Sequence, residues 1–405
     1  MSQNQAVFYG TNSASAVSEA LRAEHTRFAE GGLKMLLVLS FGRSLKNWRE
    51  EGSLKREMAV YLRYLEVGWV SDLYIYSYLC GDNLAGLNIP DHLAGKVHVL
   101  QPQKPIRSRL GLVARSLDLR AIRAAVRNGI TIVKTNQISG SWVAMIAMLF
   151  GAHVLARGGY ILSRRFKMNK QRIRYAVAIL LEWLLFNTAR RISVTTDGAA
   201  AEARRRMIGR RDRVFVNPTY VDLELFNGDV LQKTENEAVL FVGRFEPEKG
   251  VLELFDACEK AGVPLHLAGR GTLIADVLAR VGRGGVRHQY LGHLDNEGIA
   301  NLFRRYKYYV IPSKREGMPK SLIEAMGCEM VCIGTPIPGI RELISDNETG
   351  YLAQDTTTRA LADAIVRARQ DPRAVEIARA ARVFALNHHT IDAYVDRERR
   401  EWERR

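Results

Sequence analysis

The sequence has few cysteines, no Asp-x-Asp motif and no apolar run long enough to cross a membrane as a helix. The four cysteines are irregularly spaced, and no histidines lie near Cys328 and Cys332, which indicates reduced core residues and not a disulfide framework or zinc site. The longest apolar runs, 142–156 and 175–186, fall short of the ~20 residues that a spanning helix needs. The first residues lack the basic start and apolar core of a secretory signal, so we expect a cytoplasmic protein.

Positive charge is abundant, with a formal net charge of +16. Such a balance attracts nucleic acid, anionic lipid or phosphorylated substrates, and it does not choose among them. The segment SRRFKMNKQRIRY, residues 163–175, is either a solvated basic helix or an interfacial patch that docks on anionic lipid near a lipid-linked acceptor. Because no aromatic RNA-binding signature, zinc finger or clear recognition motif is present, we expect no specific nucleic-acid partner.

Short apolar runs alternate with helical segments along the chain, which predicts parallel sheets covered by helices, an α/β fold. At 405 residues the chain exceeds the usual size of a single core, so two domains are expected. The pattern starts again after a polar, turn-rich stretch near residues 210–235. We therefore predict a tail or peripheral helix over 1–33, a first Rossmann-like domain over 34–215, a second over 216–385 and a C-terminal helix over 386–405. A ligand cleft should lie between the two domains.

One candidate site is the stretch FVGRFEPEKG, residues 241–250, in which a strand runs into a glycine turn. Gly243 opens the turn, and Arg244 and Lys249 follow. Guanidinium and ammonium groups at the carboxyl end of a strand suit a diphosphate. The alternative is a solvated loop in which Lys249 pairs with Glu246 or Glu248. A nearby Gly-x-Gly in HLAGRGTL, residues 266–273, is more simply a tight turn than a ligand motif.

A second candidate site is the stretch SKREGMPKSLIEAMGCE, residues 313–329. Pro319 suits the first position of a helix, Ser321 belongs to its opening turn, and Gly327 suits its end. Glu316 then lies before the helix and Glu324 within it, with the free amides and dipole of the helix start available to an anion. Alternatively, Glu324 is an ordinary surface glutamate and Glu316 an ordinary loop residue.

Taken together, Arg244, Lys249, Glu316 and Glu324 resemble the donor-binding half of GT-B glycosyltransferases, particularly the retaining family 4 group. The Glu-x7-Glu signature and its continuation through Gly339, Glu342 and NETGYL carry this resemblance over residues 215–355. It implies that Glu324 holds the ribose hydroxyls, that Glu316 contacts the donor sugar, and that Arg244 and Lys249 neutralise the leaving diphosphate. The main chain at Gly317, Met318 and Pro319 would lie beside sugar and phosphates, and Leu291 and Gly292 would border the base.

In the first half of the chain the resemblance is looser. Gly42 and Arg43 occupy the turn that would face the acceptor and the donor phosphates. Many relatives carry His-Gly after a central strand, where this chain has Arg157 and Gly158, so Arg157 takes the place of that histidine as a candidate acceptor-side residue. The resemblance also implies that the last helix crosses back to the first domain, where Trp402 could pack.

The sequence thus predicts a retaining glycosyltransferase that uses a nucleoside-diphosphate sugar and needs neither metal nor cofactor, since closely spaced aspartates are absent. The expected acceptor is a glycan or polyprenyl-linked lipid in surface polysaccharide or glycolipid synthesis, at the inner face of the membrane. The alternatives are a sugar-nucleotide epimerase of related fold, a catalytically silent binding partner, or a nucleic-acid binder suggested by charge alone.

Overall fold

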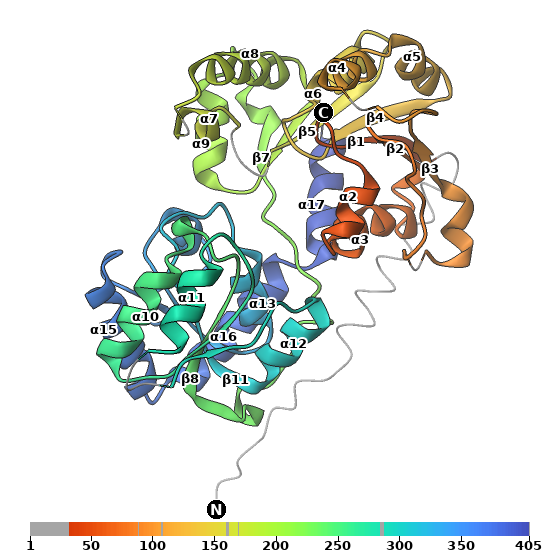
Figure 1. The fold of residues 1–405 in the computed structure, drawn as a ribbon. Coiled ribbons are helices and arrows are strands. Elements are labelled where there is room, and N and C mark those ends of the chain that lie inside the picture. Colours follow the sequence, from red (N-terminus) through yellow and green to blue (C-terminus); the bar gives the residue numbers. More distant parts are fainter. Residues whose placement is uncertain are drawn as a thin grey trace, which may run out of the picture.

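The computed structural model describes residues 32–87, 89–106, 108–158, 162–168, 170–283 and 287–404. The predicted N-terminal tail lies outside these residues apart from its last two, and Leu33 begins the first strand. Two parallel β-sheets, each with helices on both faces, form two domains (Figure 1). The α/β class predicted from the sequence is confirmed.

The first sheet has seven parallel strands in the order β3-β2-β1-β4-β5-β6-β7. Its central strands are mainly apolar because helices cover both faces of the sheet. The strands are β1 (Leu33–Val38), β2 (Val70–Tyr76), β3 (Val97–Leu100), β4 (Ile130–Thr135), β5 (His153–Gly158), β6 (Arg191–Val194) and β7 (Val214–Val216). Since β7 pairs with β6, this sheet continues to Val216.

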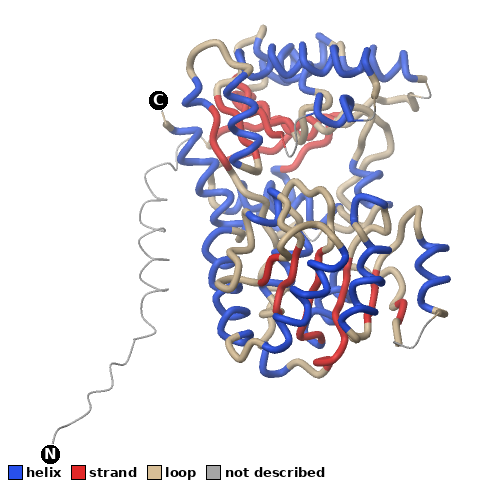
Figure 2. The backbone as a smooth tube through the Cα atoms, turned by 90° about the vertical axis from the view of Figure 1, so that its left-hand side faces the viewer, coloured by secondary structure: helices blue, strands red, loops and turns tan. Residues whose placement is uncertain are grey.

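Two layers of helices enclose this first sheet, each with its own apolar core. On one face lie α2 (Leu45–Glu50), α3 (Leu54–Glu66) and the chain's last helix, α17 (Ile391–Glu403). The other face is covered by α5 (Leu119–Arg127), α6 (Ser141–Met148), α8 (Arg172–Thr188) and α9 (Asp197–Arg205). Two shorter helices, α4 (Arg109–Ser116) and α7 (Leu162–Met168), contribute Leu112 and Phe166 to this second layer. Along the top of the first domain, Figures 1 and 2 both show helices of this layer.

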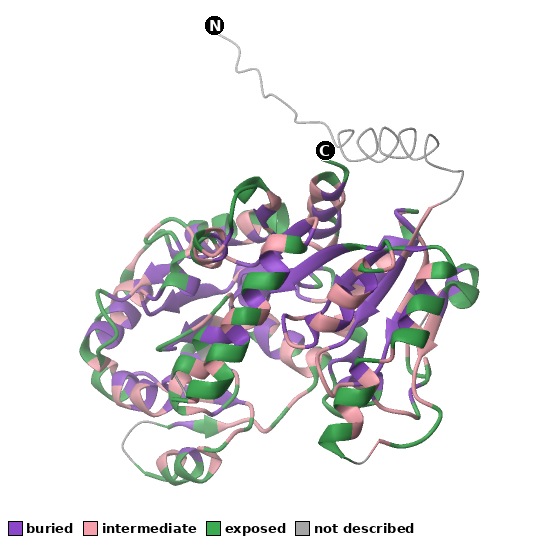
Figure 3. Cartoon of the chain, turned by 90° about the horizontal axis from the view of Figure 1, so that it is seen from above, coloured by how far each residue is buried: buried purple, intermediate pink, exposed green. Residues whose placement is uncertain are grey.

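The second sheet has six parallel strands in the order β10-β9-β8-β11-β12-β13. They are β8 (Glu235–Val242), β9 (Leu265–Ala268), β10 (Gln289–Tyr290), β11 (Tyr306–Ile311), β12 (Val331–Gly334) and β13 (Tyr351–Leu352). One face packs on α10 (Val251–Ala261), α11 (Ile274–Val281) and α15 (Thr358–Gln370). The other packs on α12 (Asn296–Arg305), α13 (Lys320–Gly327), α14 (Pro338–Arg341) and α16 (Ala374–His388). In Figure 3 the strands are buried and the outer sides of the helices are exposed.

Both sheets reverse their strand order at one point, between β1 and β4 in the first and between β8 and β11 in the second. Helices leave the sheet toward opposite faces at such a point, which opens a crevice beyond the carboxyl ends of the two strands. Loops that follow β8 and β11 therefore flank the crevice of the second domain. These loops contain the two stretches that the sequence singles out.

The chain returns to the first domain at its end, and the blue ribbon of α17 lies beside α2 and α3 in Figure 1. A fully buried ion pair joins Lys134 of β4 to Glu398 of α17. Lys134 Nζ also donates to the Tyr64 hydroxyl at 2.6 Å, and the Tyr394 hydroxyl donates to Glu398 at 3.0 Å. Burial lowers the pKa of Lys134 to about 8, with Glu398 acting in the opposite direction. Trp402, near the end of α17, is buried as well.

Candidate donor-binding site

The loop after β8 is held in place by backbone contacts with the loop after β9. The Gly243 and Phe245 N–H groups donate to the carbonyls of Ala268 and Arg270 at 3.1 and 2.9 Å. A Cβ at Gly269 would lie 1.9 Å from the Gly243 oxygen, and one at Gly271 would lie 2.3 Å from the Phe245 oxygen. The Gly-x-Gly of HLAGRGTL thus permits close packing of two loops.

Lys249 meets Glu316 at the point where the loops after β8 and β11 approach each other. The next residue, Gly250, has φ +66°, and a Cβ there would lie 2.3 Å from the Pro312 oxygen, so the two loops touch. Lys249 Nζ donates to Glu316 Oε1 at 2.5 Å, and the Ser313 hydroxyl donates to the same oxygen at 2.7 Å. Both charged side chains are mostly buried. The structure therefore brings these two predicted residues together.

Arg244 does not join that pair. Its guanidinium lies 3.5 Å from the Glu248 carboxylate, and its side chain is 67% exposed. The alternative interpretation of this loop, in which Lys249 pairs with Glu246 or Glu248, is wrong for Lys249 because Glu316 is its partner. Arg244 is instead the residue that pairs with Glu248, and its side chain remains exposed to solvent at the carboxyl end of β8.

The segment from Glu316 to the start of α13 is packed through its backbone. A Cβ at Gly339 would lie 2.1 Å from the Gly317 oxygen, so glycine is required there. The Thr219 N–H donates to Met318 Sδ at 3.2 Å, which ties this segment to the linker between the domains. Pro319 stands at the N-cap position of α13, one residue before the predicted one, and no side chain caps the helix. The first amides of α13 are thus available to an anion.

Glu324 lies within α13 with only 6% of its surface exposed, so it is not the ordinary surface glutamate of the alternative interpretation. No described residue donates a hydrogen bond to its carboxylate. Burial raises the pKa of Glu324, and the positive charges of Arg56 and Lys320 oppose that rise. A buried carboxylate that lacks a donor is costly. The hydroxyls of a ligand would satisfy it.

Tyr309 of β11 contacts the start of α13, although no sequence pattern singled it out. Its hydroxyl donates to the Ser321 hydroxyl at 2.8 Å, which fixes the first turn of α13. Burial raises the pKa of Tyr309, and the charges of Glu316 and Glu324 both add to that rise. The charges of both carboxylates therefore act on the tyrosine hydroxyl.

Lys320, the first residue of α13, joins the two domains and was also missed. Its ammonium lies 3.5 Å from Glu57 of α3 and 5.3 Å from the centre of the Tyr220 ring. Burial alone would raise the pKa of Glu57, but Lys320, Arg157 and Arg56 together lower it. Lys320 belongs to a stretch that the sequence singled out. Its partner Glu57 is 263 residues away along the chain, so the pairing of the two could not be predicted.

Arg157 lies in the same charged group, at the end of β5. Its guanidinium is 5.5 Å from the centre of the Tyr394 ring, and the residue is only 7% exposed. Burial opposes its charge, yet the neighbouring Tyr394, Tyr61, Tyr220 and Glu57 raise its pKa. Its proposed place on the acceptor side stays a prediction.

The remaining predicted positions lie in the turns after β1 and β10. Gly42 has φ +74°, and Arg43 donates to both oxygens of Glu51 at 2.6 Å, so this guanidinium already has a partner. Gly292 has φ +89° and accepts from the Gly269 N–H at 2.9 Å, while Leu291 packs against the core of the second domain. Among the described residues, no group of three or more His, Cys, Asp or Glu side chains is placed to hold a metal ion.

Residues 225–383, which include both glutamates and Lys249, match the family model of glycosyl transferases group 1. The matched residues make up most of the second domain and less than half of the chain. The resemblance carried by the Glu-x7-Glu signature is thereby confirmed. Within the glycosyl transferases group 1 domain, the signature glutamates are the two that flank the uncapped start of α13.

Two curated proteins are similar to parts of this chain. An uncharacterized glycosyltransferase of Methanocaldococcus jannaschii is 31% identical over 128 residues, which is 31% of this chain and 36% of that protein. O-antigen chain mannosyltransferase B of Escherichia coli is 26% identical over 251 residues, or 56% of this chain and 65% of that protein. Each match thus spans less than two thirds of the relative's own length.

The likeness to solved structures extends over both domains. The crystal structure of Anabaena HepE in complex with UDP and glucose matches with a TM-score of 0.66 at 17% identity, covering 90% of this chain and 98% of that chain. The fold is therefore GT-B, as predicted.

Proposed function

We propose that the protein is a glycosyltransferase that moves a sugar from a nucleoside-diphosphate sugar to a glycan or polyprenyl-linked acceptor. The observation that carries this proposal is the placement of Glu316 and Glu324 on either side of the uncapped start of α13, one paired with Lys249 and the other buried without a hydrogen-bond donor. A ligand with two hydroxyl-bearing sugars joined by a diphosphate matches this order of groups.

Each residue then has a task. Glu324 accepts hydrogen bonds from the ribose, and Glu316 contacts the donor sugar. Negative charge grows on the phosphate as the glycosidic bond breaks, so Arg244, Lys249 and the first amides of α13 act where that charge develops. Gly243, Gly317, Met318 and Pro319 lie beside the sugar and phosphates, Ser321 holds the helix start, and Leu291 and Gly292 border the base.

The finer parts of the proposal are retention of configuration, transfer without metal, and a role in surface polysaccharide or glycolipid assembly at the inner face of the membrane. Arg244 and Lys249 support metal-free transfer, because their positive charges would neutralise the leaving diphosphate in place of a metal ion. Similarity to an O-antigen chain mannosyltransferase supports the polysaccharide role. Gly42, Arg43 and Arg157 remain the candidates for the acceptor side.

A thermal-shift comparison of UDP, GDP and ADP, and of their sugar conjugates, tests the donor site in EDTA and again with magnesium. Ligand binding to the folded state raises the melting temperature through mass action. We expect one nucleoside diphosphate to stabilise the protein in EDTA. No shift with any of them, in either buffer, would contradict the proposal.

Two variants separate binding from transfer. Glu316→Gln should reduce sugar transfer by about a hundredfold or more with little change in nucleotide affinity, whereas Glu324→Ala should weaken nucleotide binding first. Glu348→Gln, at an exposed glutamate of the same domain, is the matched control. The anomeric configuration of the product, followed by NMR, tests retention. Conversion of the nucleotide sugar without any acceptor would indicate the epimerase alternative.

A further inference from the structure

Nearly all of the net positive charge belongs to one continuous part of the first domain. Residues 104–196 contain seventeen Lys or Arg and only two acidic residues, in a chain whose formal net charge is +16. Each of these two acidic residues already pairs with an arginine. Glu182 is fully buried and pairs with Arg206, and Asp118 caps α5 and pairs with Arg115 at 3.1 Å. The cations that this segment exposes are therefore not neutralised by carboxylates of the same segment.

The predicted basic segment 163–175 is not one helix. Helix α7 ends at Met168, Lys170 has φ +54°, and α8 begins at Arg172. Phe166, one of the apolar residues of this segment, packs against the core of the first domain and does not face solvent freely. Arg172 and Arg174 remain exposed in the first turn of α8, and neither forms an ion pair with a described residue. The basic end of α8 is thus the part of this segment that is open to a partner.

Beyond that basic end, α8 exposes an apolar stripe. Ile173, Val177, Leu180 and Leu184 follow one another at intervals of four, three and four residues and are 83%, 52%, 57% and 36% exposed. Trp183, beside them, is 40% exposed. The opposite side of α8 buries Ala178, Leu185 and Phe186 in the core, so this helix is apolar on both sides. A helix of that kind normally has a partner on each side.

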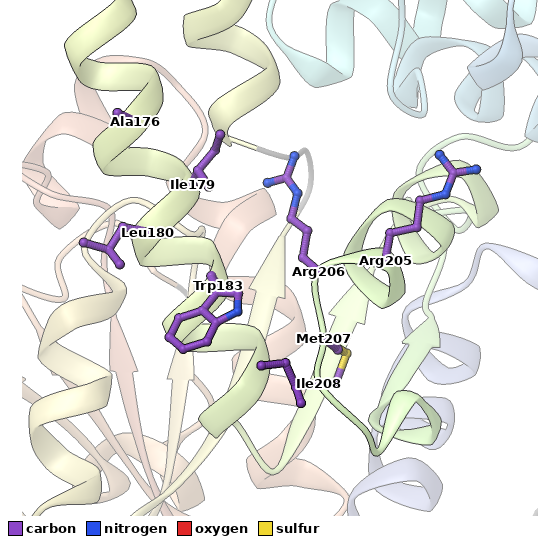
Figure 4. A pocket seen from close by; sticks show the side chains of 8 residues that line it. All are labelled: Ala176, Ile179, Leu180, Trp183, Arg205, Arg206, Met207 and Ile208. Carbon is purple, nitrogen blue, oxygen red and sulfur yellow. The ribbon is translucent and has the colours of Figure 1, made fainter.

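A groove beside α8 enlarges this apolar surface. Figure 4 shows Ile179 and Trp183 of α8 facing Met207 and Ile208, which follow α9. Ile208 is 77% exposed. Arg205 stands at the edge of the same groove and is exposed, whereas Arg206 is held by Glu182 and Glu202. Apolar side chains and a cation thus border one another here, as they do at the start of α8.

Other exposed apolar residues belong to the same helical layer. Of the fifteen large apolar side chains that are exposed among the described residues, eleven lie between residues 110 and 208. Five of these belong to α4, α5 or the ends of these helices and of α6: Leu110, Val113, Leu117, Leu119 and Leu149. This layer covers one face of the first sheet, and α2, α3 and α17 cover the opposite face. Concentration on one face distinguishes a docking surface from scattered exposed residues.

We propose that the outer side of α8 with its groove is a docking surface for a bilayer that contains anionic lipids. In this arrangement α8 lies in the plane of the interface, Ile173, Leu180 and Trp183 enter the acyl region, and Arg172 and Arg174 bind lipid phosphates. No helix in the described part of the chain is long and apolar enough to span a membrane, and α8 itself has 17 residues. Nucleic acid would satisfy the arginines but would leave the aliphatic stripe in water.

This surface identifies where the proposed enzyme would meet a lipid-linked acceptor, and it stands on observations apart from the donor site. Vesicle binding without any nucleotide-induced stabilisation would contradict the proposed function alone. Nucleotide-induced stabilisation without vesicle binding would contradict the docking surface alone.

Trp183 provides a direct spectroscopic test. Of the five tryptophans, Trp48, Trp69 and Trp402 are buried and Trp142 is half-buried, so Trp183 is the exposed one. Vesicles of phosphatidylglycerol mixed with phosphatidylcholine should bind the protein at moderate salt and shift its tryptophan emission to shorter wavelength. Vesicles of phosphatidylcholine alone should bind far less. Trp183→Phe should keep binding in a sedimentation assay and lose the emission shift.

Two pairs of substitutions test the apolar and the charged part separately. Ile173→Ser with Leu180→Ser should lower partitioning by about tenfold or more, as should Arg172→Gln with Arg174→Gln. The matched control is Leu278→Ser with Val383→Ser in the second domain. Leu278 is 50% exposed and Val383 is 56% exposed. This control should bind like the parent protein. Unchanged nucleotide-dependent melting would show that every variant is folded.

Three results would overturn the docking surface. The first is equal binding to anionic and neutral vesicles. The second is vesicle binding without a change in the emission of Trp183. The third is a duplex DNA of arbitrary sequence that displaces the protein from vesicles and binds the serine variants as tightly as the parent, which would mark the surface as a nucleic-acid site.

Discussion

The ammonium group of Lys320 lies 3.5 Å from the carboxylate of Glu57, and this ion pair joins the first turn of α13 in the second domain to α3 in the first. Both side chains are less than a quarter exposed. Because the same turn of α13 is the proposed position of the donor diphosphate, the contact between the domains and the donor site share one residue.

Glu57→Gln should destabilise the protein by roughly 1–3 kcal/mol because Lys320 loses its charged partner in a mostly buried position. The folded state lowers the pKa of Glu57, so this contribution is present above the ordinary glutamate pKa and is lost as the pH falls through the lowered value. Denaturant unfolding at several pH values measures it. The control is Glu66→Gln, whose pair with Arg63 is more exposed and should contribute less than about 1 kcal/mol. Equal losses in both variants would contradict a special role for Glu57.

Nucleotide affinity should fall in mildly acidic solution because Glu324 must be ionised to accept hydrogen bonds from two ribose hydroxyls. Burial raises its pKa, so the loss should begin at a higher pH than an ordinary glutamate would give. Calorimetric titration of the stabilising nucleoside diphosphate across this range measures the effect. Glu324→Gln should bind more weakly and without this pH dependence. If the variant and the parent protein share one pH profile, another group is responsible.

Glu342 should make the protein less stable as the pH rises through neutrality. Burial, and then the nearby charge of Asp197 in the first domain, raise its pKa to about 7. A carboxyl with a raised folded-state pKa contributes stability that is complete below its unfolded pKa and is lost as the pH rises through the folded value. Glu342→Gln should therefore melt at a higher temperature than the parent at about pH 8, with a smaller difference at about pH 5. Glu348→Gln should show no such dependence.

Glu398→Gln should destabilise the first domain by about 3–5 kcal/mol because Lys134 would remain buried without its counter-charge. Replacement of both partners, Lys134→Met with Glu398→Leu, should restore much of that loss, since apolar side chains of similar volume avoid the desolvation penalty. Chemical denaturation measures both effects. A double variant no more stable than Glu398→Gln would show that the charged pair itself is required.

Local patterns predicted much of the fold. Apolar runs located the strands from β1 to β6 and from β8 to β12, since a strand covered on both faces is apolar along its length. The pattern of residues 53–67 predicts a helix, and α3 spans Leu54–Glu66. The three-residue β7 and two-residue β13 carry too little pattern to be recognised, and β7 completes the first sheet within the stretch where the sequence predicts the domain boundary.

The candidate site was predictable where it rests on neighbouring residues. Glu316, Glu324 and the helix that contains Glu324 follow from the local motif, whereas the partners of these residues come from elsewhere in the chain. Arg56 and Glu57 reach α13 from another domain, and Tyr309 is a strand residue like any other in the sequence. The pairing of Arg244 with Glu248 instead of a shared cluster with Lys249 depends on side-chain directions that spacing does not determine.

The return of α17 also has a consequence for biosynthesis. The core between α3 and the first sheet contains Tyr394, Val395 and Trp402, which leave the ribosome after the whole second domain. Until then Lys134 lacks its counter-ion Glu398, and the part of this core that α17 covers remains open. The nascent first domain must therefore wait, partly open, while the second domain is synthesised, and a chaperone that holds its exposed face would matter most during that interval.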